Sequence, residues 1–208
     1  MESLASVVSR QFQALAPLEL LAVLLAVGYL LLAIRQNIWC WFFAAISTAI
    51  YVYLFLQAKL YMESLLNIFY FAMALYGWTI WYFGRVGNAG LPVSVWSRSI
   101  HAVALVVIAA ISLTTGYLLD RFTDAAFPYV DSMTTWGAVW ATFLVARKVL
   151  ENWWYWLVID VTSVFIYWAR DLQLTSLLFV IYVMLVPIGL LSWTRSYREV
   201  KQAVPVVP

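Results

Sequence analysis

The sequence is built from apolar stretches that are each long enough to cross a lipid bilayer. A helix that spans the hydrocarbon core needs about 20 mostly apolar residues, and inside a membrane such a segment satisfies its backbone polar groups as a helix. We therefore predict an all-α integral membrane fold with seven transmembrane helices, in a single transmembrane domain over residues 1–208. The predicted spans are Leu18–Ile34, Ile38–Leu56, Leu60–Phe83, Ile100–Leu119, Asp131–Val149, Trp153–Ala169 and Leu174–Trp193.

The composition agrees with this interpretation. The chain is 65% hydrophobic and 11% charged, whereas soluble domains carry about 25% charged and 45–50% apolar residues. The net charge of +2 is too small to indicate a nucleic-acid partner. Aromatic residues reach 18%, with 12 Trp, which is more than two interfacial belts need. We expect the lipid bilayer as the main partner and some aromatic side chains at an interior site.

The connections give the expected orientation. Gly84–Trp96 is predicted to be a linker because of its glycines, proline and polar residues, and the tail from Tyr197 onward is predicted to be disordered. With the N-terminus outside, eight Lys and Arg lie on the inner side and four on the outer side. The positive-inside rule therefore predicts an outer N-terminus and a cytoplasmic C-terminus. Arg147, Lys148 and Glu151 are interpreted as a charged cluster at the inner interface.

The chain also contains an internal repeat. A shift of 112 residues lays the third predicted span on the seventh, and a gap of three residues extends the match to the spans before them. Two three-helix repeats, residues 18–83 and 131–193, would thus be joined by the linker helix 100–119 and run parallel. Transporters use parallel repeats with a site between them near mid-membrane. The matched residues are Ser64 and Ser176, Tyr70 and Tyr182, Gly77 and Gly189, Trp81 and Trp193, and Asn37, Trp39 and Trp41 with Asn152, Trp154 and Trp156.

One segment, residues 151–167, combines aromatic and acidic residues on a single helical face. Trp153, Trp156 and Asp160 lie at positions i, i+3 and i+7, and Ser163 and Tyr167 extend the same face. A carboxylate in so apolar a segment requires a polar cavity or a partner. The arrangement could hold a flat cationic or polar aromatic solute. The alternative is that the tryptophans form an interfacial belt and Asp160 pairs with another helix.

Other polar residues in the spans have two interpretations each. Asn67 could contact a ligand or join two helices. Thr48 and Tyr51 could contact a ligand, or their hydroxyls could serve backbone groups. Asp131 is predicted to have a structural role at the start of the fifth span, as an N-cap or as an anion on the helix dipole, and Gly77 is predicted to permit close helix contact.

No constellation for catalysis is present in the sequence. There is no Gly-rich phosphate loop and no nucleophile beside a base, and the single His101 and single Cys40 have no neighbours that would form a metal site. The sequence therefore predicts neither an enzyme nor a bound cofactor or metal. The scarcity of carboxylates in the spans also argues against an ion-coupled pump, because proton relays use several ionisable groups.

Two segments resemble a known family. KLYMESLLNIFYFAMALYGWTIW, residues 59–81, and RKVLENWWYWLVIDVTSV, residues 147–164, resemble the PnuC family of bacterial vitamin transporters, whose name-giving members carry nicotinamide riboside. The resemblance implies a three-plus-one-plus-three fold related to the SWEET sugar transporters. It also implies facilitated diffusion across the bacterial plasma membrane, followed by trapping of the substrate by a cytoplasmic kinase. The substrate contacts that it implies are Trp153, Trp156, Asp160 and Asn67.

One departure from the family pattern bears on the substrate. The nicotinamide riboside members carry Asn where this chain has Asp160. An ionised carboxylate only accepts hydrogen bonds, which suits the exocyclic amine and cationic ring of thiamine. Nicotinamide riboside is the first expectation and thiamine the second. A structural membrane protein without transport is the alternative class, a membrane enzyme is weaker, and the oligomeric state, including a homo-oligomer, is left open.

Overall fold

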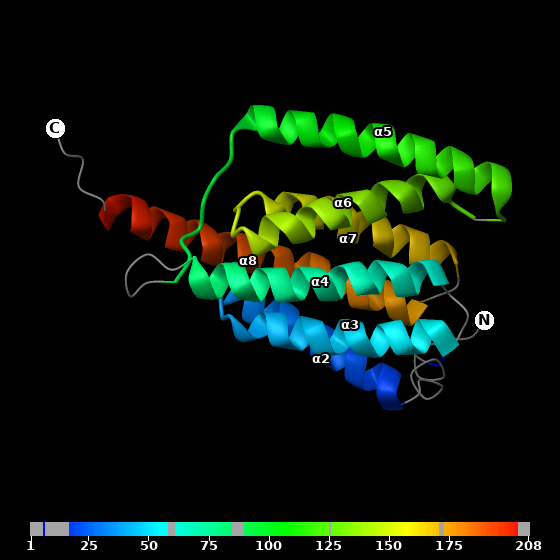
Figure 1. The fold of residues 1–208 in the computed structure, drawn as a ribbon, viewed down its shortest axis with the longest axis horizontal. Helices are drawn as coiled ribbons and strands as arrows, with labels where there is room; N and C mark the ends of the chain where they lie inside the picture. Colours follow the sequence, from blue (N-terminus) through cyan, green and yellow to red (C-terminus); the bar gives the residue numbers. More distant parts are fainter. Residues whose placement is uncertain are drawn as a thin grey trace. The chain divides into compact units, whose positions relative to one another are not determined.

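The computed structural model describes residues 6, 17–57, 61–84, 90–124, 126–170 and 173–203. Within these residues the regular structure is helical, and each predicted span corresponds to one helix (Figure 1). The all-α fold class is therefore confirmed. The helices are α2 (Pro17–Ile34), α3 (Trp39–Gln57), α4 (Tyr61–Phe83), α5 (Arg98–Phe122), α6 (Pro128–Ala146), α7 (Asn152–Ala169) and α8 (Gln173–Ala203).

Five of these helices are long and apolar enough to cross a membrane by length and composition. They are α2, α3, the Ser64–Phe83 part of α4, α5 and the Thr175–Gln202 part of α8. The two others, α6 and α7, have 19 and 18 residues. They contain Asp131 and Asp160 as well as several Trp and Tyr residues, which hydropathy scales place well below aliphatic side chains.

Two helix ends differ from the sequence-based expectations. Helix α8 continues to Ala203 instead of ending at Trp193, so the tail predicted to be disordered is helical as far as it is described. An ion pair between Arg195 Nε and Glu199 Oε1, at 3.0 Å and one turn apart, accompanies this extension. Helix α6 ends at Ala146, before the predicted Val149, because Lys148 adopts a left-handed backbone conformation with φ of 50°.

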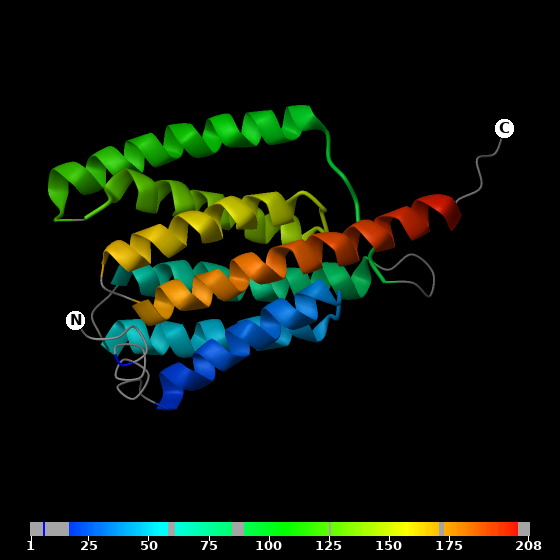
Figure 2. The same cartoon turned by 180° about the vertical axis from the view of Figure 1, so that it is seen from behind.

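The chain forms two compact units. Unit 1 comprises Met1–Ser94, Val145–Leu150 and Ile188–Pro208, and unit 2 comprises Val95–Leu144 and Glu151–Pro187. The boundary divides α8, shown from orange to red in Figure 2, at Pro187. Proline lacks a backbone N–H and therefore interrupts the hydrogen-bond ladder of a helix.

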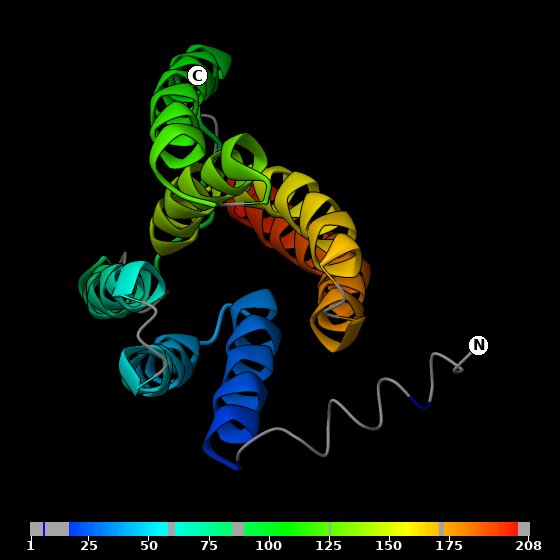
Figure 3. The ribbon, with the colours of Figure 1, turned by 90° about the vertical axis from the view of Figure 1, so that its right-hand side faces the viewer.

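In unit 1, α3 packs against both α2 and α4 (Figure 3). The Ser47 hydroxyl of α3 donates to the Ala22 carbonyl of α2 at 2.8 Å. Gly77 of α4 lies against the Trp41 indole so closely that an added Cβ would come within 2.3 Å of it. The predicted role of Gly77 in close helix contact is therefore confirmed.

Two indoles bind the carbonyl ends of helices in unit 1. Trp81 of α4 donates from Nε1 to the Ala146 carbonyl at the end of α6, at 3.1 Å. Trp193 of α8 donates from Nε1 to the Ala33 carbonyl near the end of α2, at 3.0 Å. These carbonyls are among those that a helix leaves without an internal partner. The indoles therefore fix the corners that follow α2 and α6.

In unit 2, α5 packs through a stripe of mostly small residues spaced four apart, namely Ala104, Ile108, Ser112 and Gly116. Ser112 donates to the Ser132 carbonyl of α6 at 3.3 Å. Small residues permit close approach of helices in membranes. The remaining faces of α5 carry exposed aliphatic side chains such as Val103 and Val106, as expected for a helix that contacts lipid.

Two hydrogen bonds follow the 112-residue shift of the predicted repeat. The Ser64 hydroxyl donates to the Val52 carbonyl at 3.3 Å in unit 1, and the Ser176 hydroxyl donates to the Val164 carbonyl at 2.9 Å in unit 2. Each bond joins the second and third helices of a predicted repeat. The repeat itself stays a prediction, which these equivalent bonds support.

Candidate functional site

The predicted site face of α7 is its buried face. Trp153 and Asp160 are 2% and 4% exposed, and Ser163 is buried beside them in the helical periodicity. Trp156 is half-buried. Trp154 is 56% exposed, so the opposite side of α7 faces outward. The structure thus brings Trp153, Trp156 and Asp160 together on one helix, as the spacing predicted.

The Asp160 carboxylate has no hydrogen-bond or ion-pair partner among the residues that the structure describes. Burying a carboxylate is unfavourable unless a cation or hydrogen-bond donors compensate it. The alternative in which Asp160 pairs with a neighbouring helix therefore finds no partner in the described part of the chain. The arrangement leaves an acceptor that a bound cation or amine could satisfy.

Contacts within unit 2 hold α7 in place at its N-terminal end. The Tyr155 hydroxyl lies 3.0 Å from His101 Nδ1 of α5. Glu151, which precedes α7, accepts a hydrogen bond from the Trp96 backbone N–H at 3.4 Å and lies 3.8 Å from His101 Nε2. Near the middle of α7, Ile159 packs over Gly137 of α6. These contacts connect α7 to both of its neighbours and so restrict how its site face can turn.

At the opposite end of α7, Arg170 forms an ion pair with Asp131 of α6. Of the two structural roles expected for Asp131, the structure excludes the N-cap and keeps the anion on the helix dipole, because α6 begins at Pro128 and Asp131 lies inside its first turn. Proline is favoured at the first position of a helix, where its missing N–H has no partner to lose. A carboxylate in the first turn still interacts favourably with the helix dipole, so Asp131 retains a structural role.

The other predicted site residues lie in unit 1. Thr48 of α3 donates its hydroxyl to the Ala44 carbonyl at 2.8 Å, the backbone bond that was its alternative interpretation. Tyr51 stacks on Phe55 with ring centroids 5.5 Å apart. Asn67 of α4 is half-buried and has an interaction partner. None of these contacts tests whether the three residues bind a substrate, so their assignment stays a prediction.

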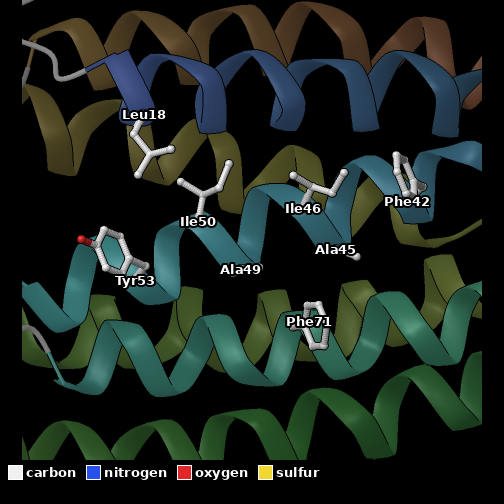
Figure 4. A pocket seen from close by; sticks show the side chains of 8 residues that line it. All are labelled: Leu18, Phe42, Ala45, Ile46, Ala49, Ile50, Tyr53 and Phe71. Carbon is white, nitrogen blue, oxygen red and sulfur yellow. The ribbon is translucent and has the colours of Figure 1, made fainter.

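Unit 1 also has an apolar groove of about 420 Å³, which includes neither Thr48 nor Tyr51 in its lining. Eight side chains line it, from Leu18 on α2 through those of α3 to Phe71 on α4 (Figure 4). The Tyr53 hydroxyl is their only polar side-chain group. This chemistry suits hydrocarbon and lacks the polar groups that orient a polar solute, so the groove is not the candidate site.

Lys148 belongs to the cluster that the sequence predicts at the inner interface, and this location stays a prediction. Arg147 is exposed, but Lys148 is only 5% exposed, and its Nζ lies 3.3 Å from Gln36 Oε1. Burial lowers the pKa of Lys148 to about 8.

The comparisons with known proteins match most of the chain to one family. The family described as nicotinamide mononucleotide transporter matches residues 16–195. The nicotinamide riboside transporter PnuC of Escherichia coli is 28% identical over 206 residues, covering 86% of this chain and 84% of that protein. The riboflavin/roseoflavin transporter RibM of Streptomyces davaonensis is 27% identical over 143 residues, covering 66% of each chain.

The crystal structure of the vitamin B3 transporter PnuC has the same fold, with a TM-score of 0.70 and 18% identity over 94% of this chain and 90% of that one. Three findings point to the same kind of membrane protein. They are the helical architecture, the membrane-length helices and the family match over most of the chain. The protein is accordingly a multi-pass membrane protein and not an enzyme, and it belongs to the PnuC family of nicotinamide mononucleotide transporters, a family of vitamin transporters.

Proposed function

We propose that this chain carries nicotinamide riboside across the membrane by facilitated diffusion and binds it on the α7 face of Trp153, Trp156 and Asp160. The observation that supports the proposal most strongly is the buried Asp160 carboxylate, which has no partner among the described residues. Relatives at 28% identity carry the name nicotinamide riboside transporter. Nicotinamide riboside contains a flat cationic ring, which matches a site made of indoles and one carboxylate.

The two indoles supply the attraction for such a ring. A cation over an indole face gains about 0.5–2 kcal/mol, depending on how far it is desolvated. Trp153 and Trp156 are three residues apart, and Asp160 follows Trp156 by one turn on the same face. A ring held by the indoles would therefore lie within reach of the carboxylate.

Thiamine is the second candidate substrate, and Asp160 is the observation that favours it. The carboxylate accepts hydrogen bonds and donates none when ionised. The exocyclic amine of thiamine could donate to it, and the thiazolium ring could bind over an indole. Nicotinamide riboside presents a carboxamide, which an Asn side chain would match with both a donor and an acceptor.

The scarcity of buried carboxylates supports facilitated diffusion. Among the described residues, Asp160 is the only Asp or Glu that is buried, whereas proton-coupled transporters use chains of ionisable groups. Such a carrier equilibrates its substrate without concentrating it. Net uptake would then need an intracellular reaction that consumes the substrate, such as phosphorylation by a cytoplasmic kinase. We retain the orientation with the C-terminus in the cytoplasm on the charge count of the connections.

A binding screen of the purified protein against nicotinamide riboside, thiamine and riboflavin tests the substrate. We expect saturable calorimetric heat with nicotinamide riboside and weaker heat with riboflavin, which carries no positive charge. Preferential binding of thiamine would support the second candidate. If a folded protein bound none of the three, the proposed substrate class would be wrong.

Uptake into proteoliposomes tests the mechanism. Without an ion gradient, labelled substrate should enter until its concentrations on the two sides are equal. An imposed proton or sodium gradient should leave that end point unchanged. Accumulation above the outside concentration under either gradient would contradict facilitated diffusion.

A further inference from the structure

The two corners that follow α2 and α6 have the same unusual backbone conformation. Gln36 has φ of 54° and Lys148 has φ of 50°, and each N–H donates at 2.9 Å to the carbonyl three residues earlier. Positive φ is uncommon for residues other than glycine. Both corners belong to unit 1, where the indoles of Trp81 and Trp193 fix the helix ends that precede them.

The conformation of these corners brings the two side chains together. Lys148 Nζ lies 3.3 Å from Gln36 Oε1 and 4.4 Å from the centroid of the Trp81 ring. The ammonium group has three hydrogen-bond donors, and the Gln36 carbonyl oxygen uses one of them. Lys148 is 5% exposed, and no carboxylate among the described residues forms an ion pair with it. Buried charges in proteins are ordinarily paired, so this cation lacks its usual counter-charge.

Lys148 and Gln36 line a pocket of about 350 Å³ in unit 1, together with Asn37, Ile38, Trp81 and the segment Gly90–Leu91. None of these residues is acidic. The Asn37 Oδ1 atom accepts the Trp39 backbone N–H at 3.0 Å, which leaves its NH₂ group as a donor. The Oε1 atom of Gln36 is likewise used by Lys148, so its NH₂ group is also left as a donor.

Further cations lie at this end of unit 1. Arg35 and Arg147 are exposed neighbours of Gln36 and Lys148 in the two corners. The C-terminal part of α8, which reaches the end of α2 through Trp193, continues with Arg195, Arg198 and Lys201 against the single Glu199. The potential around the pocket is therefore positive, which favours the approach of an anion.

We propose that the pocket lined by Gln36, Asn37, Trp81 and Lys148 is a phosphate-binding site. Lys148 supplies the counter-charge and the two amides donate hydrogen bonds to the phosphate oxygens. The phosphate group comes from an anionic lipid or from a soluble phosphate, since basic pockets between membrane helices at the interface bind lipid headgroups. This site contains none of the α7 residues of the proposed substrate site, so it does not depend on the proposed function.

The test uses the purified full-length chain and two sources of phosphate. The melting temperature is measured in detergent with inorganic phosphate at constant ionic strength, so that screening alone does not change it. It is then measured in nanodiscs of phosphatidylcholine with and without phosphatidylglycerol. We expect a dose-dependent rise of the melting temperature with at least one source, because a ligand that binds the folded state stabilises it.

Three variants test whether phosphate stabilises the protein by binding in this pocket. Lys148→Gln should weaken phosphate binding at least tenfold. Gln36→Glu places a carboxylate beside the Lys148 ammonium group. The resulting ion pair should stabilise the fold and prevent phosphate from binding. Lys201→Gln is the matched control, because it removes the same charge from an exposed position at the same end of unit 1, and it should bind like the wild type.

The outcomes separate the alternatives. Stabilisation by inorganic phosphate would show that the pocket binds a soluble phosphate. Stabilisation by phosphatidylglycerol alone would show that it binds a lipid headgroup. The proposal is overturned if neither source stabilises the wild type, or if Lys201→Gln loses as much binding as Lys148→Gln. If Lys148→Gln does not fold, Gln36→Glu decides, and binding equal to the wild type in that variant overturns the proposal.

Discussion

Asp160 and Lys148 are both buried charges of this chain, and their surroundings differ. Asp160 is 4% exposed on α7 in unit 2 and has no partner among the described residues, whereas Lys148 is 5% exposed in a corner of unit 1 and contacts Gln36 and Trp81. The carboxylate is located in a helix, on one face with two indoles. The ammonium group is positioned by its own left-handed backbone. The comparison shows that two side chains buried to the same degree can differ in how far the protein itself satisfies them.

Removing Asp160 should have the largest effect of the substitutions considered. Asp160→Ala should weaken binding of the cationic substrate by roughly 10- to 100-fold, because a hydrogen bond to a charged group contributes about 1.5–3 kcal/mol. The same variant should melt at an equal or higher temperature, because an unpaired buried carboxylate is lost. Calorimetric titration and a melting curve measure the two effects. Lower thermal stability with unchanged affinity would mean that Asp160 is a structural residue.

Removing one indole should have a smaller effect on the same site. Trp156→Ala should weaken substrate binding about tenfold, since the lost cation–π contact is worth about 0.5–2 kcal/mol. Trp154→Ala is the matched control, because Trp154 lies on the exposed side of the same helix and its loss should leave affinity unchanged. Equal losses in the two variants would show that the indoles act through folding and not through contact with the ligand.

The sequence allowed the helices and the α7 face to be predicted for different physical reasons. Apolar length located α2 to α8 within a few residues at most ends, because the bilayer sets that length. Asp160 was recognised because a carboxylate is unusual in the middle of an apolar stretch. Helix α8 was cut short at Trp193, since hydropathy marks where apolar character ends and a helix can continue beyond it, here to Ala203 with the Arg195–Glu199 pair.

The Lys148 pocket could not be predicted in the same way. A lysine beside Arg147 and Glu151 at the end of an apolar stretch is the ordinary pattern of an interface. Its burial depends on a positive φ and on contacts with Gln36, 112 residues away in the sequence, and with Trp81. Hydropathy indicates neither the positive φ nor these contacts.

The smallest expected effect concerns pH at the Lys148 pocket. Burial lowers the pKa of Lys148 from 10.5 to about 8, so the ammonium fraction falls by roughly half between pH 7 and pH 8. Sulfate, whose charge is constant in this range, should therefore bind about twofold more weakly at pH 8. Of the groups around Lys148, Gln36 and Trp81 do not titrate, and the Cys40 thiol of α3 is buried and uncharged in this range.

The lowered pKa of Lys148 also predicts how the stability of the ligand-free protein changes with pH. Between about pH 8 and pH 10.5 the unfolded chain retains the Lys148 proton that the folded chain releases, so this group makes stability rise with pH in that window. Lys148→Gln should remove that contribution, which denaturant midpoints at several pH values would reveal. Equal slopes in wild type and variant would contradict a lowered pKa at this position.

The most direct test of the account is calorimetric titration of Asp160→Asn with nicotinamide riboside and thiamine, alongside the wild type. The substitution keeps the size of the side chain, removes its charge and adds two donors. If the α7 face binds nicotinamide riboside, the variant should bind it with nearly the affinity of the wild type, through the carboxamide. If the chain carries thiamine, the variant should lose thiamine affinity. A stable variant in which both affinities equal those of the wild type, with thiamine also binding tightly, would contradict the claim that Asp160 selects the ligand.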